Sequence, residues 1–152
     1  MKKYEFTGET KQINLLFRTA TLHRIRAVVE FGLVKIGDLG GWIEKEENLS
    51  HDGKAWVCGD AKVCGDAEVF SASHVLVIGA IGSRDDFTTF FRDKDGEITV
   101  KCGCFLGKID RFLEKVASTH GNSKYALVYR AAVEVAKLQI DLTGEAPEMD
   151  EE

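Results

Sequence analysis

A six-residue repeat between residues 55 and 69 constrains the fold of this chain more than any other feature. The stretch reads AWVCGD, AKVCGD, AEV, so alanine recurs at positions 55, 61 and 67 and valine at positions 57, 63 and 69. Each unit predicts a short strand that buries alanine and valine on alternate positions and turns at a Gly-Asp pair, where glycine supplies backbone freedom. Internal periodicity of this kind is typical of a parallel β-helix built from hexapeptides.

The repeat resembles that of left-handed parallel β-helices, in which three hexapeptides form one triangular coil of about eighteen residues. The segment from Leu49 to Ile78 would supply less than about two such coils. Stacked repeats normally need about three units to bury a continuous core. We therefore expect a short β-helix whose ends are covered by the rest of the chain or whose core is completed by other subunits.

The segments on either side of the repeat predict those caps. Residues 21–31 alternate as a strand, with Arg24 and Arg26 on one face. Residues 86–105 predict a β-hairpin that turns at Asp95-Gly96, and two helices follow it. The expected fold class is α+β, a short left-handed parallel β-helix capped by N-terminal strands and by a C-terminal β-hairpin plus two helices.

Length and charge predict one domain over residues 1–144. Its parts would be N-terminal strands (1–42), the hexapeptide β-helix (43–80), the hairpin (81–106) and two helices (107–141). The net charge of -5 lies largely in residues 145–152, EAPEMDEE, which predict an acidic disordered tail. The rest of the chain is close to neutral, which argues against general nucleic-acid binding through a basic face.

The chain contains no apolar run of membrane-spanning length, and its first residues, MKKYEFTGETK, lack a signal-peptide pattern. We therefore expect no membrane partner and a cytoplasmic location.

The cysteines do not predict a metal site. Cys58 and Cys64 are one hexapeptide apart, and Cys102 and Cys104 form a C-x-C pair, which lacks the two-residue spacing typical of structural zinc. Free, reduced thiols fit a cytosolic protein better. The repeat aspartates are turn residues, because the calcium β-helix repeat is nine residues long. We expect neither a metal nor a cofactor.

The chain as a whole resembles a set of small bacteriophage and prophage proteins, in which hexapeptides lie between a constant N-terminal segment and a C-terminal hairpin-helix segment. The pieces that carry the resemblance are GDLGGWI (37–43), NLS (48–50), IGSRD (81–85) and CGCFLGKIDRFLEKV (102–116). The resemblance implies a phage origin, and hence the cytoplasm of the host cell, but it carries over no catalytic residue.

The histidines give little support to catalysis. The best-known left-handed β-helix enzymes are acyl-CoA-dependent acyltransferases with a histidine base, and the candidates here are residues 23, 51, 74 and 120. A proton-abstracting histidine needs a partner within hydrogen-bond reach, and no motif supplies one. We expect a protein that is not an enzyme, with a hexapeptide-type acyltransferase as an alternative.

The junction after the repeat predicts a ligand site. Serine, glycine amides and an arginine can hold a phosphate, and the aromatic residues nearby can stack on a base. A turn with solvated charges, followed by a hairpin packing its phenylalanines inward, is the alternative interpretation. The candidate ligand-binding residues are Arg84, Ser83, Thr89, Phe91, Arg92, Tyr125, Arg24 and Arg26.

The predicted helix over residues 124–140 is apolar around much of its circumference, so we expect a homo-oligomer, a trimer or a higher assembly. A compact, oligomeric phage protein with such a junction resembles a known class of small phage counter-defence proteins, and this resemblance implies a binding protein that sequesters a nucleotide-derived immune signal. This function would make it a counter-defence sponge. The alternatives are the acyltransferase and a protein-protein inhibitor that docks its flat β-helix face on a host defence protein.

Overall fold

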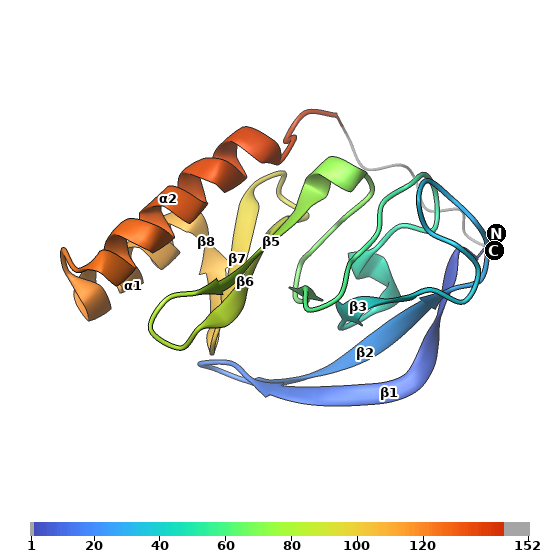
Figure 1. The fold of residues 1–152 in the computed structure, drawn as a ribbon, viewed down its shortest axis with the longest axis horizontal. Coiled ribbons are helices and arrows are strands. Elements are labelled where there is room, and N and C mark those ends of the chain that lie inside the picture. The colour runs from blue at the N-terminus through green and yellow to red at the C-terminus, as the bar shows by residue number, and fades with distance from the viewer. Residues whose placement is uncertain (1, 145–152) are drawn as a thin grey trace.

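The computed structural model describes residues 2–144, which form an α+β structure (Figure 1). Within these residues, two four-stranded sheets lie side by side, and two helices cover the outer face of the second sheet. The predicted acidic tail, residues 145–152, lies outside the described residues.

The first sheet has the strand order β1-β2-β3-β4, with antiparallel pairing except between β3 and β4, which run parallel. Its long β1–β2 hairpin carries the residues Leu15 to Arg18 at its tip. Its strands are β1 (Tyr4–Asn14), β2 (Thr19–Ala27), β3 (Leu39–Ile43) and β4 (Lys62–Val63).

The second sheet is antiparallel throughout, with the order β5-β6-β7-β8. Two 3₁₀ turns, η1 (Glu46–Asn48) and η2 (Ala72–His74), precede it, and the helices α1 (Ile109–His120) and α2 (Lys124–Gln139) follow it. Its strands are β5 (Val75–Ile81), β6 (Asp86–Arg92), β7 (Ile98–Cys102) and β8 (Phe105–Lys108).

Strand β6 is buried on both faces and separates the two main cores. Phe90 belongs to the core that the second sheet forms with α1 and α2. Its neighbour Phe91 points to the opposite face, as successive strand residues do, and belongs to the core around Val57 and Val63. The second sheet is therefore the central layer, between the helices and the hexapeptide segment.

The predicted left-handed parallel β-helix is wrong. Instead of a stack of coils, the described chain forms two sheets with mostly antiparallel pairing, and residues 55–69 contain one strand of two residues, β4. Parallel pairing in this region is limited to β3 with β4 and to a single bridge between Leu49 and Val69.

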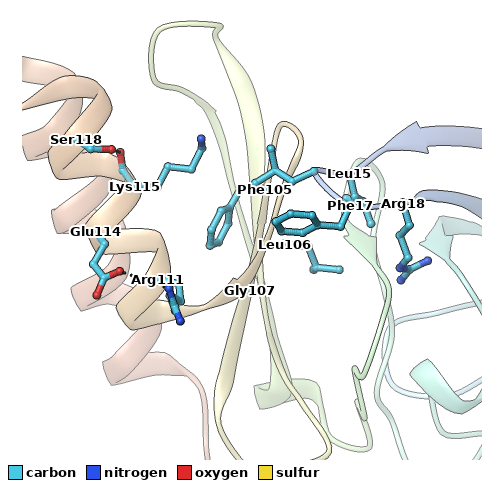
Figure 2. A pocket seen from close by; sticks show the side chains of 11 residues that line it. Leu15, Phe17, Arg18, Phe105, Leu106, Gly107, Arg111, Glu114, Lys115 and Ser118 are labelled. Atoms are coloured by element: carbon cyan, nitrogen blue, oxygen red, sulfur yellow. Dashed lines mark hydrogen bonds and ion pairs between the residues drawn. The ribbon is translucent and has the colours of Figure 1, made fainter.

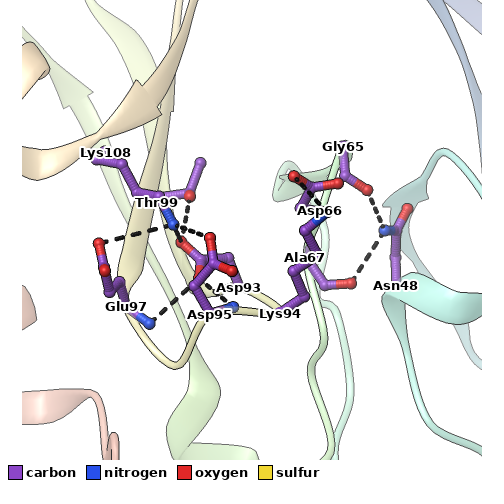
Figure 3. A network of polar contacts seen from close by, with 10 residues as sticks. All are labelled: Asn48, Gly65, Asp66, Ala67, Asp93, Lys94, Asp95, Glu97, Thr99 and Lys108. Atoms are coloured by element: carbon purple, nitrogen blue, oxygen red, sulfur yellow. Dashed lines mark hydrogen bonds and ion pairs between the residues drawn. The ribbon is translucent and has the colours of Figure 1, made fainter.

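The alanines and valines of the repeat are nevertheless all buried, in the core that also contains Phe91. Two repeats are too few to bury a continuous core against each other, so these residues bury their side chains against the sheets instead. Asn48 holds the segment in place, because its amide donates hydrogen bonds to the carbonyls of Gly65 (3.0 Å) and Ala67 (3.1 Å) (Figure 3).

The C-terminal half contains the hairpin and the two helices. Strands β6 and β7 pair around a turn at residues 93–97, and α1 buries Ile109, Phe112 and Val116 at helical spacing against the sheet. None of the helices in residues 2–144 is long and apolar enough to cross a membrane.

Candidate ligand-binding site

A cavity of about 200 Å³ lies where two turns of the second sheet meet the helices. The β5–β6 turn, the β7–β8 turn, the last turns of α1 and one side chain of α2 form its walls. We call it the Arg84 cavity. It is lined by Ile81, Ser83, Arg84, Asp86, Thr88, Cys102, Gly103, Cys104, Phe105, Phe112, Lys115, Val116, Thr119, His120 and Tyr129.

Glycine at position 82 makes the first wall possible. Gly82 has a positive φ of 81°, and a Cβ atom there would lie 1.8 Å from the hydroxyl oxygen of Tyr129. Any other residue would strain the turn and push the tyrosine away. This close approach brings the β5–β6 turn, with Ser83 and Arg84, against α2.

The β7–β8 turn forms the second wall. Cys102 pairs with Phe105, so Gly103 and Cys104 make a two-residue turn, and Gly103 has a positive φ of 57°. A Cβ atom on Gly103 would lie 3.6 Å from the Nη1 atom of Arg84. The guanidinium of Arg84 therefore lies close to the backbone of this turn.

Helix α1 forms the third wall. Because Phe112 and Val116 face the sheet, Lys115 and Thr119 follow one helical turn apart along the edge of the cavity. His120, the last residue of the helix, lies with its ring centroid 5.8 Å from that of Tyr129 in a stacked arrangement. The ring centroid of Tyr125 lies 5.7 Å from that of His120.

The charges around the cavity favour an anion. Arg84 and Lys115 outnumber Asp86, and neither cation forms an ion pair with another residue in the described range 2–144. Burial, and then the neighbouring Cys102, raise the pKa of Tyr129 to about 12. Its hydroxyl therefore stays protonated at neutral pH and can donate a hydrogen bond.

Guanidinium, ammonium and hydroxyl donors around one small space can hold a phosphate or a similar oxyanion. The volume is below the range of roughly 300–1,000 Å³ that is usual for sites enclosing a whole ligand. The Arg84 cavity can thus hold the phosphate end of a ligand, and the remainder must lie outside it.

Of the residues that the sequence proposed, Ser83 and Arg84 line this cavity. Tyr125 lies next to it, through its contact with His120, and is 42% exposed, so its ring is accessible to a ligand.

Three further candidates on β6 have structural contacts instead. Thr89 is buried, and its hydroxyl oxygen accepts a hydrogen bond from the amide of Lys62 (3.1 Å). Phe91 is fully buried in the core. Arg92 is 6% exposed and donates to the carbonyls of Thr143 (2.7 Å) and Gly144 (2.5 Å), which anchors the chain after α2.

Arg24 and Arg26 lie on β2 in the first sheet and do not line the Arg84 cavity. Each contacts a glutamate of β1, Arg24 with Glu9 at 3.3 Å and Arg26 with Glu5 at 2.6 Å. The structure therefore brings together two of the eight candidates, with a third alongside.

Sequence reasoning missed Lys115, Cys102, Cys104 and Tyr129 as neighbours of Arg84, and it considered His120 as one of four candidate bases. The sequence did hold one indication for Lys115, because Lys115 and Thr119 are one helical turn apart in the first predicted helix and so form a polar edge on it. The position of Tyr129 depends on how α2 crosses the sheet, which no local pattern reveals.

The four histidines have different surroundings. His51 and His74 accept hydrogen bonds at Nδ1 from the amides of Lys3 (3.0 Å) and Phe70 (3.2 Å), and His23 stacks on Phe6 with centroids 4.4 Å apart. His120 is the histidine that lines the Arg84 cavity.

Within residues 2–144, no group of three or more histidine, cysteine or acidic side chains is placed to hold a metal ion. Searches against protein-family models and against curated proteins found no match to this chain.

Proposed function

We propose that the protein binds a phosphorylated, nucleotide-derived signal molecule at the Arg84 cavity without converting it. The observation that carries the proposal is the convergence of Arg84 and Lys115 on one cavity beside Ser83 and Tyr129. These residues come from the β5–β6 turn and from the two helices, which follow that turn only after strands β6 to β8. A charge-assisted contact to a phosphate would give both cations a partner.

We also propose that the protein comes from a bacteriophage and acts in the host cytoplasm as a counter-defence sponge. The resemblance to phage proteins supports this context, since it rests in part on residues 81–85 and 102–116. Both pieces contribute walls of the Arg84 cavity, Ser83 and Arg84 from the first and Cys102 to Phe105 from the second.

A homo-oligomer, a trimer or a higher assembly, is the form we propose in solution. Support comes from the outward face of α2, where Leu127, Val135 and Leu138 are 61%, 47% and 89% exposed. These residues recur at helical spacing and so form one apolar stripe. Large contiguous apolar surface on a water-exposed helix favours contact with another chain.

Binding fits the surroundings of His120 better than acyl transfer does. A histidine base needs an orienting partner within hydrogen-bond reach. Among the ion pairs of the described residues, His51 is the histidine that faces a carboxylate, with Nε2 3.8 Å from Glu46, and His51 does not line the Arg84 cavity. The protein-inhibitor alternative relied on a flat β-helix face, and that fold prediction is wrong.

A thermal-shift screen tests the proposal. Purified protein is heated with cyclic dinucleotides, cyclic trinucleotides and cyclic ADP-ribose isomers, and any stabilising ligand is then recovered after denaturation. We expect at least one of them to raise the melting temperature and to return intact. Recovery of a converted product would show an enzyme, and a panel without any stabilising nucleotide would refute the sponge.

A further inference from the structure

A larger hollow adjoins the Arg84 cavity. It has a volume of about 820 Å³ and lies between the tip of the β1–β2 hairpin, strand β8 and the outer side of α1 (Figure 2). We call it the hairpin groove. Phe105 and Lys115 line both hollows, so the two meet at these side chains.

The hairpin tip is held in position beside the cavity. The amide of Leu16 donates a hydrogen bond to the carbonyl of Cys104 (3.1 Å), the residue before Phe105. Arg18, at the base of the tip, donates two hydrogen bonds to the carboxylate of Glu44, at 2.6 and 3.0 Å. The groove therefore has a fixed wall on the hairpin side and the helix on the other.

The side chains at the groove fit a flat aromatic group near negative charge. Phe17 is 97% exposed at the tip and Leu16 is 52% exposed, so the fold does not need either side chain. Arg111, Glu114 and Lys115 extend from α1 on the opposite side, where Arg111 pairs with Glu114 at 4.0 Å and Lys115 forms no ion pair within residues 2–144 (Figure 2). An exposed aromatic ring with cations nearby is the arrangement that stacks nucleobases in single-stranded nucleic-acid sites.

We propose that the base of the bound nucleotide lies in the hairpin groove against Phe17, while its phosphate occupies the Arg84 cavity. This inference rests on the proposed function, which supplies the phosphate. The Arg84 cavity alone, at about 200 Å³, is too small for a nucleotide, whereas the adjoining groove provides the missing space. Lys115 lies at the boundary, where the sugar-phosphate would pass.

A matched pair of ligands isolates the base. AMP and ribose 5-phosphate differ by the adenine, and both are titrated calorimetrically into the wild type, Phe17→Ser and the control Leu33→Ser. Leu33 is 99% exposed in the loop between β2 and β3 and lines neither hollow. Leu33→Ser therefore replaces an exposed apolar side chain by serine, as Phe17→Ser does, but away from the proposed site.

We expect the wild type to bind AMP more tightly than ribose 5-phosphate. Phe17→Ser should weaken AMP about fivefold to a hundredfold, the effect of one lost base-aromatic stack. It should leave ribose 5-phosphate unchanged, and Leu33→Ser should change neither ligand.

Unchanged AMP affinity in Phe17→Ser, equal losses for both ligands, or no binding of AMP by the wild type would each overturn the groove assignment. The proposed function would survive these results if the nucleotide screen succeeds and Arg84→Ala still weakens binding about tenfold to hundredfold. If no nucleotide in the screen stabilises the protein, both the groove assignment and the proposed function are wrong.

Discussion

The carboxylate of Asp93 organises the turn that leads from β6 to β7 and connects it to the start of α1 (Figure 3). It is 2% exposed and accepts hydrogen bonds from the amides of Asp95 (2.9 Å) and Glu97 (3.2 Å). It also accepts hydrogen bonds from the hydroxyl of Thr99 and from the ammonium of Lys108, both at 2.7 Å. Lys108 is the N-cap residue of α1, so one buried side chain holds hairpin and helix together.

Replacing Asp93 with alanine should destabilise the protein by about 3 kcal/mol. Removing the carboxylate leaves the buried hydroxyl of Thr99 without its acceptor, and such a loss costs roughly 1–3 kcal/mol, toward the upper end where the lost partner is charged. The ammonium of Lys108 adds little to this cost, because its side chain is 37% exposed and keeps a second partner, Asp95, at 2.8 Å. For a chain of this length, a loss of about 3 kcal/mol corresponds to a fall in melting temperature of roughly 6–12 °C.

Urea denaturation of Asp93→Ala and of Asp95→Ala measures the effect. Asp95 contacts the same ammonium but is exposed, so its removal should cost about 1 kcal/mol or less. If the two variants lose equal stability, or if Asp93→Ala loses less than about 1 kcal/mol, the reasoning about this network is wrong.

The pH dependence gives a second check on Asp93. Burial alone would raise the pKa of this carboxyl, but hydrogen bonds from Lys108, Thr99 and two backbone amides outweigh burial and lower it. A folded-state pKa below the unfolded value adds stability above about pH 4, and that stability is lost as the pH falls through the folded pKa. Asp93→Asn should therefore lose less stability on acidification than the wild type.

Three further predictions concern the core, the assembly and the N-terminus. Val63→Asp puts a charge at a fully buried position and should cost several kcal/mol, whereas Asp60→Ser, at an exposed turn, should cost about 0.5 kcal/mol or less; equal thermal shifts would contradict this. Light scattering should show an oligomer that Leu138→Glu dissociates, because that residue is 89% exposed on the apolar stripe of α2, and a monomeric wild type would refute the assembly. Burial, partly opposed by Asp52, lowers the pKa of Lys3 to about 8 in the folded protein. The free energy of unfolding should therefore rise between about pH 8 and the ordinary lysine pKa of 10.5, as the buried ammonium loses its proton. Urea denaturation at several pH values should show that Lys3→Met removes this rise.

Local sequence patterns predicted which residues are buried wherever burial follows the periodicity of a single segment. The alternation of alanine and valine in residues 55–69 identified the buried positions, including Val57 and Val63. In α1, the buried residues Ile109, Phe112 and Val116 also follow helical spacing, so the buried face can be read from the sequence in the same way. In both cases a side chain's orientation follows from backbone periodicity alone.

The arrangement of these elements could not be read in the same way. Residues 55–69 bury their valines whether they stack in coils or cover a sheet, so periodicity does not distinguish the two. Strand β6 shows the same limitation, because the sequence predicted ligand-binding side chains at Thr89, Phe91 and Arg92 and could not show that a layer covers each face of the strand. Both faces are covered, and Thr89, Phe91 and Arg92 are buried as a result.

The candidate site was partly predictable for the same reason. Ser83 and Arg84 lie in a polar segment, GSRDD (82–86), whose composition predicts a turn. Lys115 and Tyr129 join them only because α1 and α2 pack across the sheet, with Tyr129 meeting Gly82 at close range. Contacts of this kind depend on tertiary packing, which one sequence does not specify locally.

The affinity of Arg84→Ala for the nucleotide that stabilises the wild type tests the central claim most directly. Loss of a charge-assisted contact typically costs about 1.5–3 kcal/mol, or roughly a tenfold to hundredfold fall in affinity. We expect that fall in Arg84→Ala, with the melting temperature of the unliganded protein and the oligomer mass unchanged. The matched control Arg26→Ala, which removes an arginine outside the cavity, should bind as the wild type does. Wild-type affinity in Arg84→Ala, or an equal loss in Arg26→Ala, would contradict the account.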